Sequence, residues 1–439
     1  MVFLPSVLVA AATLTSVASA SYPRFSSSLE PRAVSEKGPL APKEDPWYTA
    51  PPSFASGEPG QILRIRPAPG NLTQVVGNCS AAYNILYRTT DSHYKPTWAV
   101  TTLFVPKTSN GTAAASSTWG KALLSYQIPY DSADVDASPS YALYKNPPGD
   151  IAAALGQSWF VSVPDYEGPL GSFTAGVMSG HATLDSVRAV RAASFGLAPD
   201  ARYAMWGYSG GALASEWAAE LAVQYAPELD FAGAALGGLT PNVTSVMLSV
   251  EGTVGVGLVP SGILGLASQF PELRKYVEDN LKTDGEFNKT GFLAAENYTL
   301  SESAVAFANH NISDYFKNGF DLVYSPVAQR VINSDGQMGY HGVPQMPLYV
   351  YKAVQDEISP VNETDALVQR FCNVGATISY VRNGAGSHTT EFVNGLAGAA
   401  KFLQSVLAGD FNSTGCTTKN VNISLVDNAL RRRDLHLVW

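Results

Sequence analysis

From residue 63 onward, short apolar runs alternate with longer runs whose apolar residues recur at helical spacing. Short apolar runs bounded by turn-forming residues are typical of strands that are buried on both faces. The pattern predicts strands at 99–105, 122–128, 159–163, 201–206, 347–354 and 376–381, and helices at 150–155, 182–195, 212–225 and 389–407. Because strands and helices alternate, we expect an α/β fold with a mostly parallel sheet flanked by helices.

This alternation lapses between residues 236 and 330, where a Gly-rich apolar stretch precedes a polar region of helical character. Such a segment indicates a largely helical cap inserted into the core. Residues 21–60 are rich in Pro, Ser and charge, which is typical of an extended arm or a propeptide. The predicted organisation is a signal peptide at 1–20, the arm at 21–60, core segments at 61–235 and 331–416, the cap at 236–330 and a tail at 417–439.

The most apolar part of the predicted cap spans residues 253–264. Its glycines and Pro260 argue against a helix that spans a membrane. Two interpretations remain open, a lid that touches a lipid surface and a cap helix that packs over the core. Either one lets this stretch line a cleft that binds an acyl group.

Composition narrows the classes of function. With 46% hydrophobic and 15% charged residues, the 439-residue chain has the composition of an ordered globular protein. Its 28 basic and 37 acidic residues give a net charge of −9, which repels the phosphates of nucleic acids. The short basic run at 431–433 is interpreted as a solvated tail or a processing site. Binding to nucleic acid is therefore not expected.

Features near the N-terminus predict export. An apolar stretch at 7–12 is followed by small residues that end at Ala18-Ser19-Ala20, a pattern typical of a signal peptide and its cleavage site. Ten N-x-S/T sequons agree with passage through a glycosylating compartment, at Asn71, Asn78, Asn110, Asn242, Asn288, Asn297, Asn311, Asn362, Asn412 and Asn422. We expect a secreted, extracellular glycoprotein without a transmembrane segment.

Three cysteines allow one disulfide and leave one thiol. Cys372 and Cys416 flank the last predicted strand and helix, so a bond between them ties the end of the chain to the core. Cys79 lies far away in an N-terminal strand, where burial as an inert thiol is the commoner fate. Because the cysteines are scattered and the six histidines show no ligand spacing, neither a metal nor a cofactor is expected.

The best candidate for chemistry is Gly207-Tyr208-Ser209-Gly210-Gly211, which joins a predicted strand to a predicted helix. The pattern G-x-S-x-G at a sharp strand-to-helix turn needs small residues around the serine, because backbone and side chains are forced together there. The N–H of Gly210 then points at any anion that forms beside the serine hydroxyl. This is the geometry of an acyl-transfer nucleophile, although the same sequence pattern also occurs in tight turns that have no catalytic function.

A serine nucleophile needs a base, usually a histidine that is oriented by a carboxylate. In the α/β-hydrolase arrangement these groups follow in the order serine, acid, histidine. Among the later histidines, His388 follows a predicted strand through a Gly-rich loop. In contrast, His310 falls in the predicted cap, His341 in a loop and His436 in the tail. His388 is therefore the predicted base.

Asp356 is the predicted acid, because it leaves the strand before His388 at the same edge of the sheet. Glu357 is the alternative, and Asp365 is better explained as a residue at the start of the next helix. An oxyanion hole must complete the site. The N–H of Gly210 is one donor, and the loop at 128–132, which lacks an HGGG sequence, is well placed to provide the second.

Several segments together resemble the fungal secretory lipase family, over about residues 45–416. They are Tyr126-Gln127 with Tyr130-Asp131, and residues 163–169, 207–212 and 356–360. The resemblance implies an α/β-hydrolase core with an inserted cap and a triad of Ser209, Asp356 and His388. It also implies an oxyanion hole from Asp131 and Gly210.

The same resemblance implies hydrolysis of carboxylic esters of long-chain acids, including triacylglycerols, without a cofactor. Cys372 and Cys416 match the family's C-terminal disulfide. A second disulfide, which links the oxyanion loop to the cap in some members, has no cysteines here. We therefore expect that loop and the cap to move more freely.

The predicted function is a secreted serine lipase that hydrolyses triacylglycerols and other carboxylic esters through an acyl-enzyme on Ser209. Its partner is a lipid or ester substrate, met at a lipid–water interface where the substrate is insoluble. The alternatives are an esterase, peptidase or acyltransferase with the same triad, and a non-catalytic relative that binds lipid through the cap.

Overall fold

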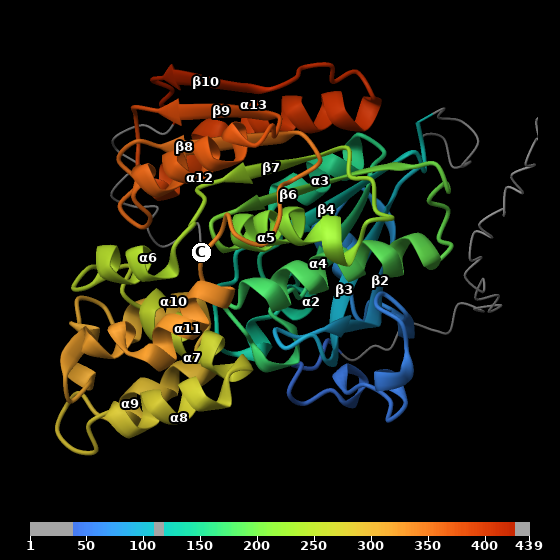
Figure 1. Cartoon of the computed structure of the whole chain (residues 1–439). Helices are drawn as coiled ribbons and strands as arrows, with labels where there is room; N and C mark the ends of the chain where they lie inside the picture. The colour runs from blue at the N-terminus through green and yellow to red at the C-terminus, as the bar shows by residue number, and fades with distance from the viewer. Residues whose placement is uncertain (1–37, 109–117, 426–439) are drawn as a thin grey trace, which may run out of the picture.

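The computed structural model describes residues 38–108 and 118–425, which form a central sheet with helices on both sides and a helical layer beyond one edge (Figure 1). The predicted signal peptide, the sequon at Asn110, the basic run at 431–433 and His436 lie outside the described residues.

The sheet confirms the predicted α/β fold. Its ten strands are β1 Ile62–Pro67, β2 Cys79–Thr90, β3 Pro96–Pro106, β4 Ala122–Gln127, β5 Phe160–Pro164, β6 Arg202–Tyr208, β7 Gly233–Gly237, β8 Leu348–Ala353, β9 Ile378–Asn383 and β10 Cys416–Val421. They lie in the order β1-β2-β3-β5-β4-β6-β7-β8-β9-β10. Strands β1, β2, β3 and β5 pair antiparallel, whereas all neighbours from β5 to β10 pair parallel.

Helices cover both faces of this sheet. One face carries α4 Gly176–Ala192, α5 Gly210–Tyr225 and α12 Val361–Asn373, and the other carries α1 Leu72–Val76, α3 Gly149–Gly156 and α13 His388–Ala408. Alternate residues of one strand supply the two cores, since Leu123 packs on the first side and Leu124 on the second. Because both faces are buried, several of these strands read as continuous apolar runs, and β3, β4, β5, β6, β8 and β9 match predicted strands. Strand β7 is equally buried but was not predicted.

The parallel strands end along one edge of the sheet, as an open α/β fold requires. The loops and helix starts after β4, β6, β8 and β9 carry Asp131, Ser209, Asp356 and His388 respectively. These residues are far apart in the sequence, and the strand order gathers them.

A largely helical layer follows β7 and lies beyond this edge (yellow and orange in Figure 1). Its helices are α6 Val243–Val250, α7 Leu258–Gln269, α8 Pro271–Asn280, α9 Lys289–Leu293, α10 Leu300–Ala306 and α11 Pro326–Asp335. The layer differs from the predicted limits of 236 and 330 at both ends. Leu236 lies in β7, and α11 runs on to Asp335 because Val331 and Ile332 are buried in the core beneath it. None of the helices in the described ranges is both long and apolar enough to cross a bilayer.

The two ends of the described chain are tied to the sheet. In the predicted arm, Asp45 forms an ion pair of 2.6 Å with Arg66 of β1. At the other end, β10 corrects the prediction of a tail from residue 417, because Cys416–Val421 pairs with β9. The side chains of this edge strand are almost all exposed and polar, so no apolar alternation marks it in the sequence.

The predicted disulfide is confirmed. Cys372 in α12 is bonded to Cys416 at the start of β10, with the two Cα atoms 5.9 Å apart. Cys79 is a free, buried thiol, and burial raises its pKa. The disulfide therefore anchors the edge strand to α12 on one face of the sheet.

Candidate active site

Ser209 lies between β6 and α5 in a strained conformation, with φ 53° and ψ −121°. A positive φ is uncommon for a residue with a side chain and persists only where the surroundings enforce it. A Cβ at Gly207 would lie 2.1 Å from Gly211 O, and one at Gly211 would lie 2.0 Å from Gln127 O. Because no larger residue fits at either position, the predicted elbow has a direct steric reason.

The imidazole of His388 lies between a hydroxyl and a carboxylate. Its Nε2 is 2.9 Å from Ser209 Oγ, and its Nδ1 is 2.6 Å from Asp356 Oδ2. All three residues are buried, with exposed fractions of 3% for Ser209, 0% for His388 and 8% for Asp356. In this arrangement the imidazole can accept the serine proton while the carboxylate stabilises the imidazolium.

The Asp356 carboxylate has partners on both oxygens. Its Oδ1 accepts hydrogen bonds from the N–H groups of Ile358 and Ser359, at 3.0 and 2.8 Å. Its Oδ2 also faces the ammonium of Lys352 at 2.8 Å. Burial by itself raises the pKa of the Asp356 carboxyl, but the charges of His388 and Lys352 outweigh burial and hold the pKa well below its usual range. Asp356 is therefore ionised.

Lys352 was not among the site residues predicted from the sequence. Its side chain is completely buried, and its Nζ donates a hydrogen bond to Leu239 O at 2.7 Å besides the contact with Asp356. Burial lowers the pKa of Lys352, and the Asp356 charge opposes that change. The signal in the sequence is a lysine near the end of an otherwise apolar strand, four positions before the predicted acid.

Neighbouring residues hold the backbone of His388. It is the first residue of α13, whose N-cap Ser387 forms a capping box with Thr390. The Tyr208 hydroxyl donates to His388 O, and Glu357 Oε2 accepts from His388 N at 2.9 Å. Glu357, the alternative acid, thus binds the backbone of the histidine, and Asp356 binds its ring.

Asp131 and Gly210 lie against each other beside Ser209. Asp131 has φ 43°, and a Cβ on Gly210 would lie 1.9 Å from Asp131 Oδ1. Gly210 begins the 16-residue helix α5, and the first N–H groups of a helix have no partner within it. Burial raises the pKa of the Asp131 carboxyl to about 7, against the opposing effect of His388.

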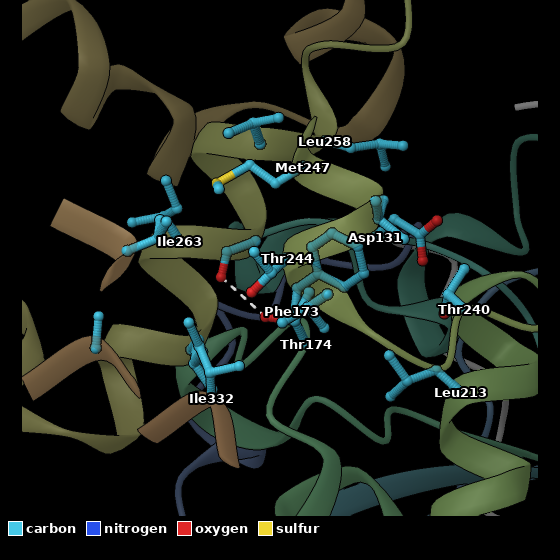
Figure 2. Close-up of a pocket in the computed structure, with 18 of the residues that line it drawn as sticks. Asp131, Phe173, Thr174, Leu213, Thr240, Thr244, Met247, Leu258, Ile263 and Ile332 are labelled. Atoms are coloured by element: carbon cyan, nitrogen blue, oxygen red, sulfur yellow. Dashed lines mark hydrogen bonds between the residues drawn. The ribbon is translucent and has the colours of Figure 1, made fainter. Parts of the chain in front are cut away.

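A cavity extends from Ser209 into the helical layer (Figure 2). It encloses about 870 Å³ of space between the atoms, a volume that includes open solvent. Most of its lining is apolar and comes from α6, α7, α8 and α11, for example Met247, Ile263 and Ile332. The cavity therefore presents a mainly apolar surface next to the serine.

Residues 253–264 were interpreted either as a lid that touches a lipid surface or as a cap helix that packs over the core. Helix α7, which begins at Leu258, decides between these interpretations for its own residues. Most of its residues are buried, and several line the cavity, so this part is a cap helix packed over the core. Val254, just before the helix, is 58% exposed and remains on the surface.

Two of the other candidate histidines, His310 and His341, contact different groups. His310 Nδ1 is 3.1 Å from the Tyr315 hydroxyl in the helical layer, and the His341 ring packs on Trp217 with centroids 4.4 Å apart. Within residues 38–108 and 118–425, no cluster of three or more His, Cys, Asp and Glu is arranged to hold a metal ion.

Comparison with known proteins identifies the family of the chain. A family model described as secretory lipase matches residues 149–415. A trichothecene C-3 esterase from Fusarium sporotrichioides is 53% identical over 406 residues, which cover 90% of this chain and 91% of that protein. Lipase A from Arthroderma benhamiae is 35% identical, with coverage of 90% and 85%. The crystal structure of Candida antarctica lipase A in its closed state superposes with a TM-score of 0.78 at 26% identity, with coverage of 90% and 93%. The chain is therefore a carboxylic ester hydrolase and belongs to the secretory lipase family.

Proposed function

We propose that the chain hydrolyses esters through an acyl-enzyme on Ser209. Ser209 Oγ attacks the ester carbonyl while His388 Nε2 takes its proton, and Asp356 stabilises the imidazolium. The imidazolium then protonates the leaving alcohol, and water activated by the same imidazole releases the acid. The observation that carries this proposal is the unbroken contact from Ser209 Oγ through the imidazole to Asp356, at 2.9 and 2.6 Å.

The proposed oxyanion hole consists of the backbone N–H groups of Asp131 and Gly210. Support comes from the position of Gly210 at the start of α5 and from its close approach to Asp131. One such donor typically contributes about 3 kcal/mol of transition-state stabilisation.

Two classes of substrate fit the apolar cavity. In the first, the cavity holds the long acyl chain of a triacylglycerol, and the similarity to Lipase A of Arthroderma benhamiae favours this class. In the second, the cavity holds a bulky apolar alcohol that carries a short acyl group. The 53% identity to a trichothecene C-3 esterase favours the second class.

A panel of esters tests both parts of the proposal. The purified protein is assayed on emulsified triacylglycerols, on p-nitrophenyl esters of increasing chain length and on a trichothecene acetylated at C-3. Ser209→Ala is expected to abolish turnover and labelling by a fluorophosphonate, whereas the exposed control Ser301→Ala retains both. Normal turnover by Ser209→Ala contradicts the mechanism, and the preferred ester identifies the substrate class.

We propose also that the protein is exported, on the strength of residues 7–20 and of the secretory description of the matching family. Expression of the full chain in a fungal host, followed by N-terminal sequencing of the medium fraction, is expected to yield a protein that starts after Ala20 or later. Retention of the uncleaved chain inside the cells contradicts this part.

A further inference from the structure

Three polar atoms in the cavity lining have no hydrogen-bond partner within the described part of the chain. They are Asp131 Oδ1, Thr240 Oγ1 and Thr244 Oγ1, and all three atoms are buried. Asp131 is 1% exposed and Thr240 is 7% exposed, so both belong to the interior. Buried polar groups are nearly always hydrogen-bonded, since leaving one unpaired is costly. Their gathering in one cavity therefore calls for an explanation.

Two of the three groups lie at the end of the cavity that holds Ser209. Asp131 Oδ1 is the atom that approaches Gly210, the residue after the nucleophile. Thr240 follows Gly238 by two positions, and a Cβ on Gly238 would lie 3.0 Å from His388 Cε1. Figure 2 shows Asp131 and Thr240 on one side of the view, with apolar side chains from the helical layer on the other.

Another threonine in the same lining provides a contrast. Thr174 Oγ1 donates a hydrogen bond to Gly262 O at 2.9 Å, so its hydroxyl is already used within the protein. An apolar cavity with a few unpaired polar groups is the usual composition of a site that orients a specific ligand. A plain alkyl chain offers no partner to Thr240, Thr244 or Asp131, whereas an oxygen atom on the substrate does.

We propose that Asp131 and Thr240 form a polar subsite for a hydroxyl or ether oxygen near the ester of the substrate, and that Thr244 offers a further polar partner in the same cavity. This subsite rests on the proposed ester hydrolysis. It predicts that the preferred substrates are esters of oxygenated apolar skeletons and not plain alkyl esters. The threonine hydroxyls donate to such an oxygen or accept from it. Because burial raises the pKa of the Asp131 carboxyl to about 7, this group also carries a proton to donate in acidic medium.

Matched pairs of esters test the subsite. The first pair is trans-2-methoxycyclohexyl acetate and trans-2-ethylcyclohexyl acetate, which places the oxygen on the alcohol. The second is p-nitrophenyl 4-methoxybutanoate and p-nitrophenyl hexanoate, which places it on the acyl group. The wild-type protein is expected to prefer the ether in one pair by about tenfold in kcat/KM, the ratio that one hydrogen bond to a buried group supplies. The pair that shows the preference identifies the side of the ester that the subsite contacts.

Variants connect the preference to the hydroxyls. Thr240→Val with Thr244→Val keeps the side-chain shape and is expected to bring the ratio within each pair close to one. Thr240→Ser with Thr244→Ser retains the hydroxyls and the preference, and Thr174→Val in the same cavity also retains the preference. Circular dichroism and fluorophosphonate labelling of Ser209 verify that each variant is folded and active.

The outcomes separate the subsite from the reaction. Equal turnover within both pairs by the wild-type protein overturns the subsite while ester hydrolysis stands. A preference that survives in the valine double variant overturns it as well. Absence of turnover and of labelling at Ser209 in the folded wild-type protein overturns the proposed function itself.

Discussion

Replacing Lys352 by methionine tests whether the charge of Asp356 depends on a buried cation. Methionine keeps the apolar stem and removes the ammonium, which lies 2.8 Å from Asp356 Oδ2 and 2.7 Å from Leu239 O. The side chains of Lys352 and Asp356 are both 0% exposed, so water cannot replace the lost contacts unless the fold opens. Removing one partner of a buried ion pair costs about 3–5 kcal/mol of stability.

That cost predicts a shift in thermal unfolding. With about 2.1 cal/mol/K of unfolding entropy per residue, the 439-residue chain has an unfolding entropy of about 0.9 kcal/mol/K. The midpoint of unfolding of Lys352→Met is therefore expected to fall by about 3–5 °C. Calorimetry or circular dichroism measures this fall. Lys275→Met is the matched control, because the Lys275 ion pair with Asp279 is exposed and its loss leaves the midpoint unchanged.

The pH dependence provides a second readout. In the wild-type protein the pKa of Asp356 is depressed, so its contribution to stability is present above the ordinary carboxyl pKa and is lost as pH falls through the depressed value. Without the Lys352 charge, only His388 and the two backbone N–H groups oppose burial, and the pKa of Asp356 rises. The loss of stability and the fall in kcat/KM for a soluble ester are both expected to begin at a higher pH in Lys352→Met.

A double-mutant cycle decides whether the two residues act as a pair. Asp356→Asn removes the charge that Lys352 neutralises, so the double variant is expected to be more stable than the two single losses predict, by about 1–3 kcal/mol. The cycle uses stability alone, because Asp356→Asn removes an orienting group of the proposed mechanism. Additive losses, or an acid limb in Lys352→Met that coincides with the wild-type limb, would refute the reasoning.

Three further variants test other parts of the site and the fold. In the wild-type protein, kcat/KM is expected to fall as pH rises through about 7, because the buried Asp131 carboxyl then gains a charge beside the forming oxyanion. Asp131→Asn is expected to remove this fall. A fall that persists in the pH–rate profile of the variant contradicts the prediction. Gly210→Ala places a Cβ 1.9 Å from Asp131 Oδ1, so kcat is expected to drop at least tenfold while circular dichroism stays that of a folded protein. Cys372→Ser with Cys416→Ser removes a disulfide with a sequence separation of 44, and the free energy of unfolding is expected to fall by about 4 kcal/mol. An unchanged denaturation midpoint excludes that contribution.

The residues that the structure brings together were largely predictable from their order in the chain. Ser209, Asp356 and His388 each follow a parallel strand, and parallel strands bring their carboxyl ends to one edge of the sheet whatever covers its faces. Each of these residues follows a predicted strand through a turn, and this order along the chain was sufficient to propose them as partners. Of the adjacent carboxylates, Asp356 contacts the His388 ring, whereas Glu357 contacts the His388 backbone, a contact that the sequence did not indicate.

Other parts of the molecule had no local signal. Strand β10 is polar and exposed, so its membership of the sheet depends on pairing with β9 and not on apolar alternation. The end of α11 depends on the burial of Val331 and Ile332 beneath the helical layer. A lysine in a strand is ordinarily a surface residue, and only the fold places Lys352 against Asp356.

The spacing of apolar residues along the chain was enough to determine the α/β fold. The glycines of the elbow determined the strained turn at Ser209, and the order of strands determined the edge of the sheet where its partners lie. These features follow from short-range sterics and from burial of both faces of a sheet. Tertiary packing decided the charge state of Asp356, the shape of the cavity and the unpaired hydroxyl of Thr240. These depend on which distant elements exclude water around a group, and that exclusion arises only when the helical layer closes over the sheet.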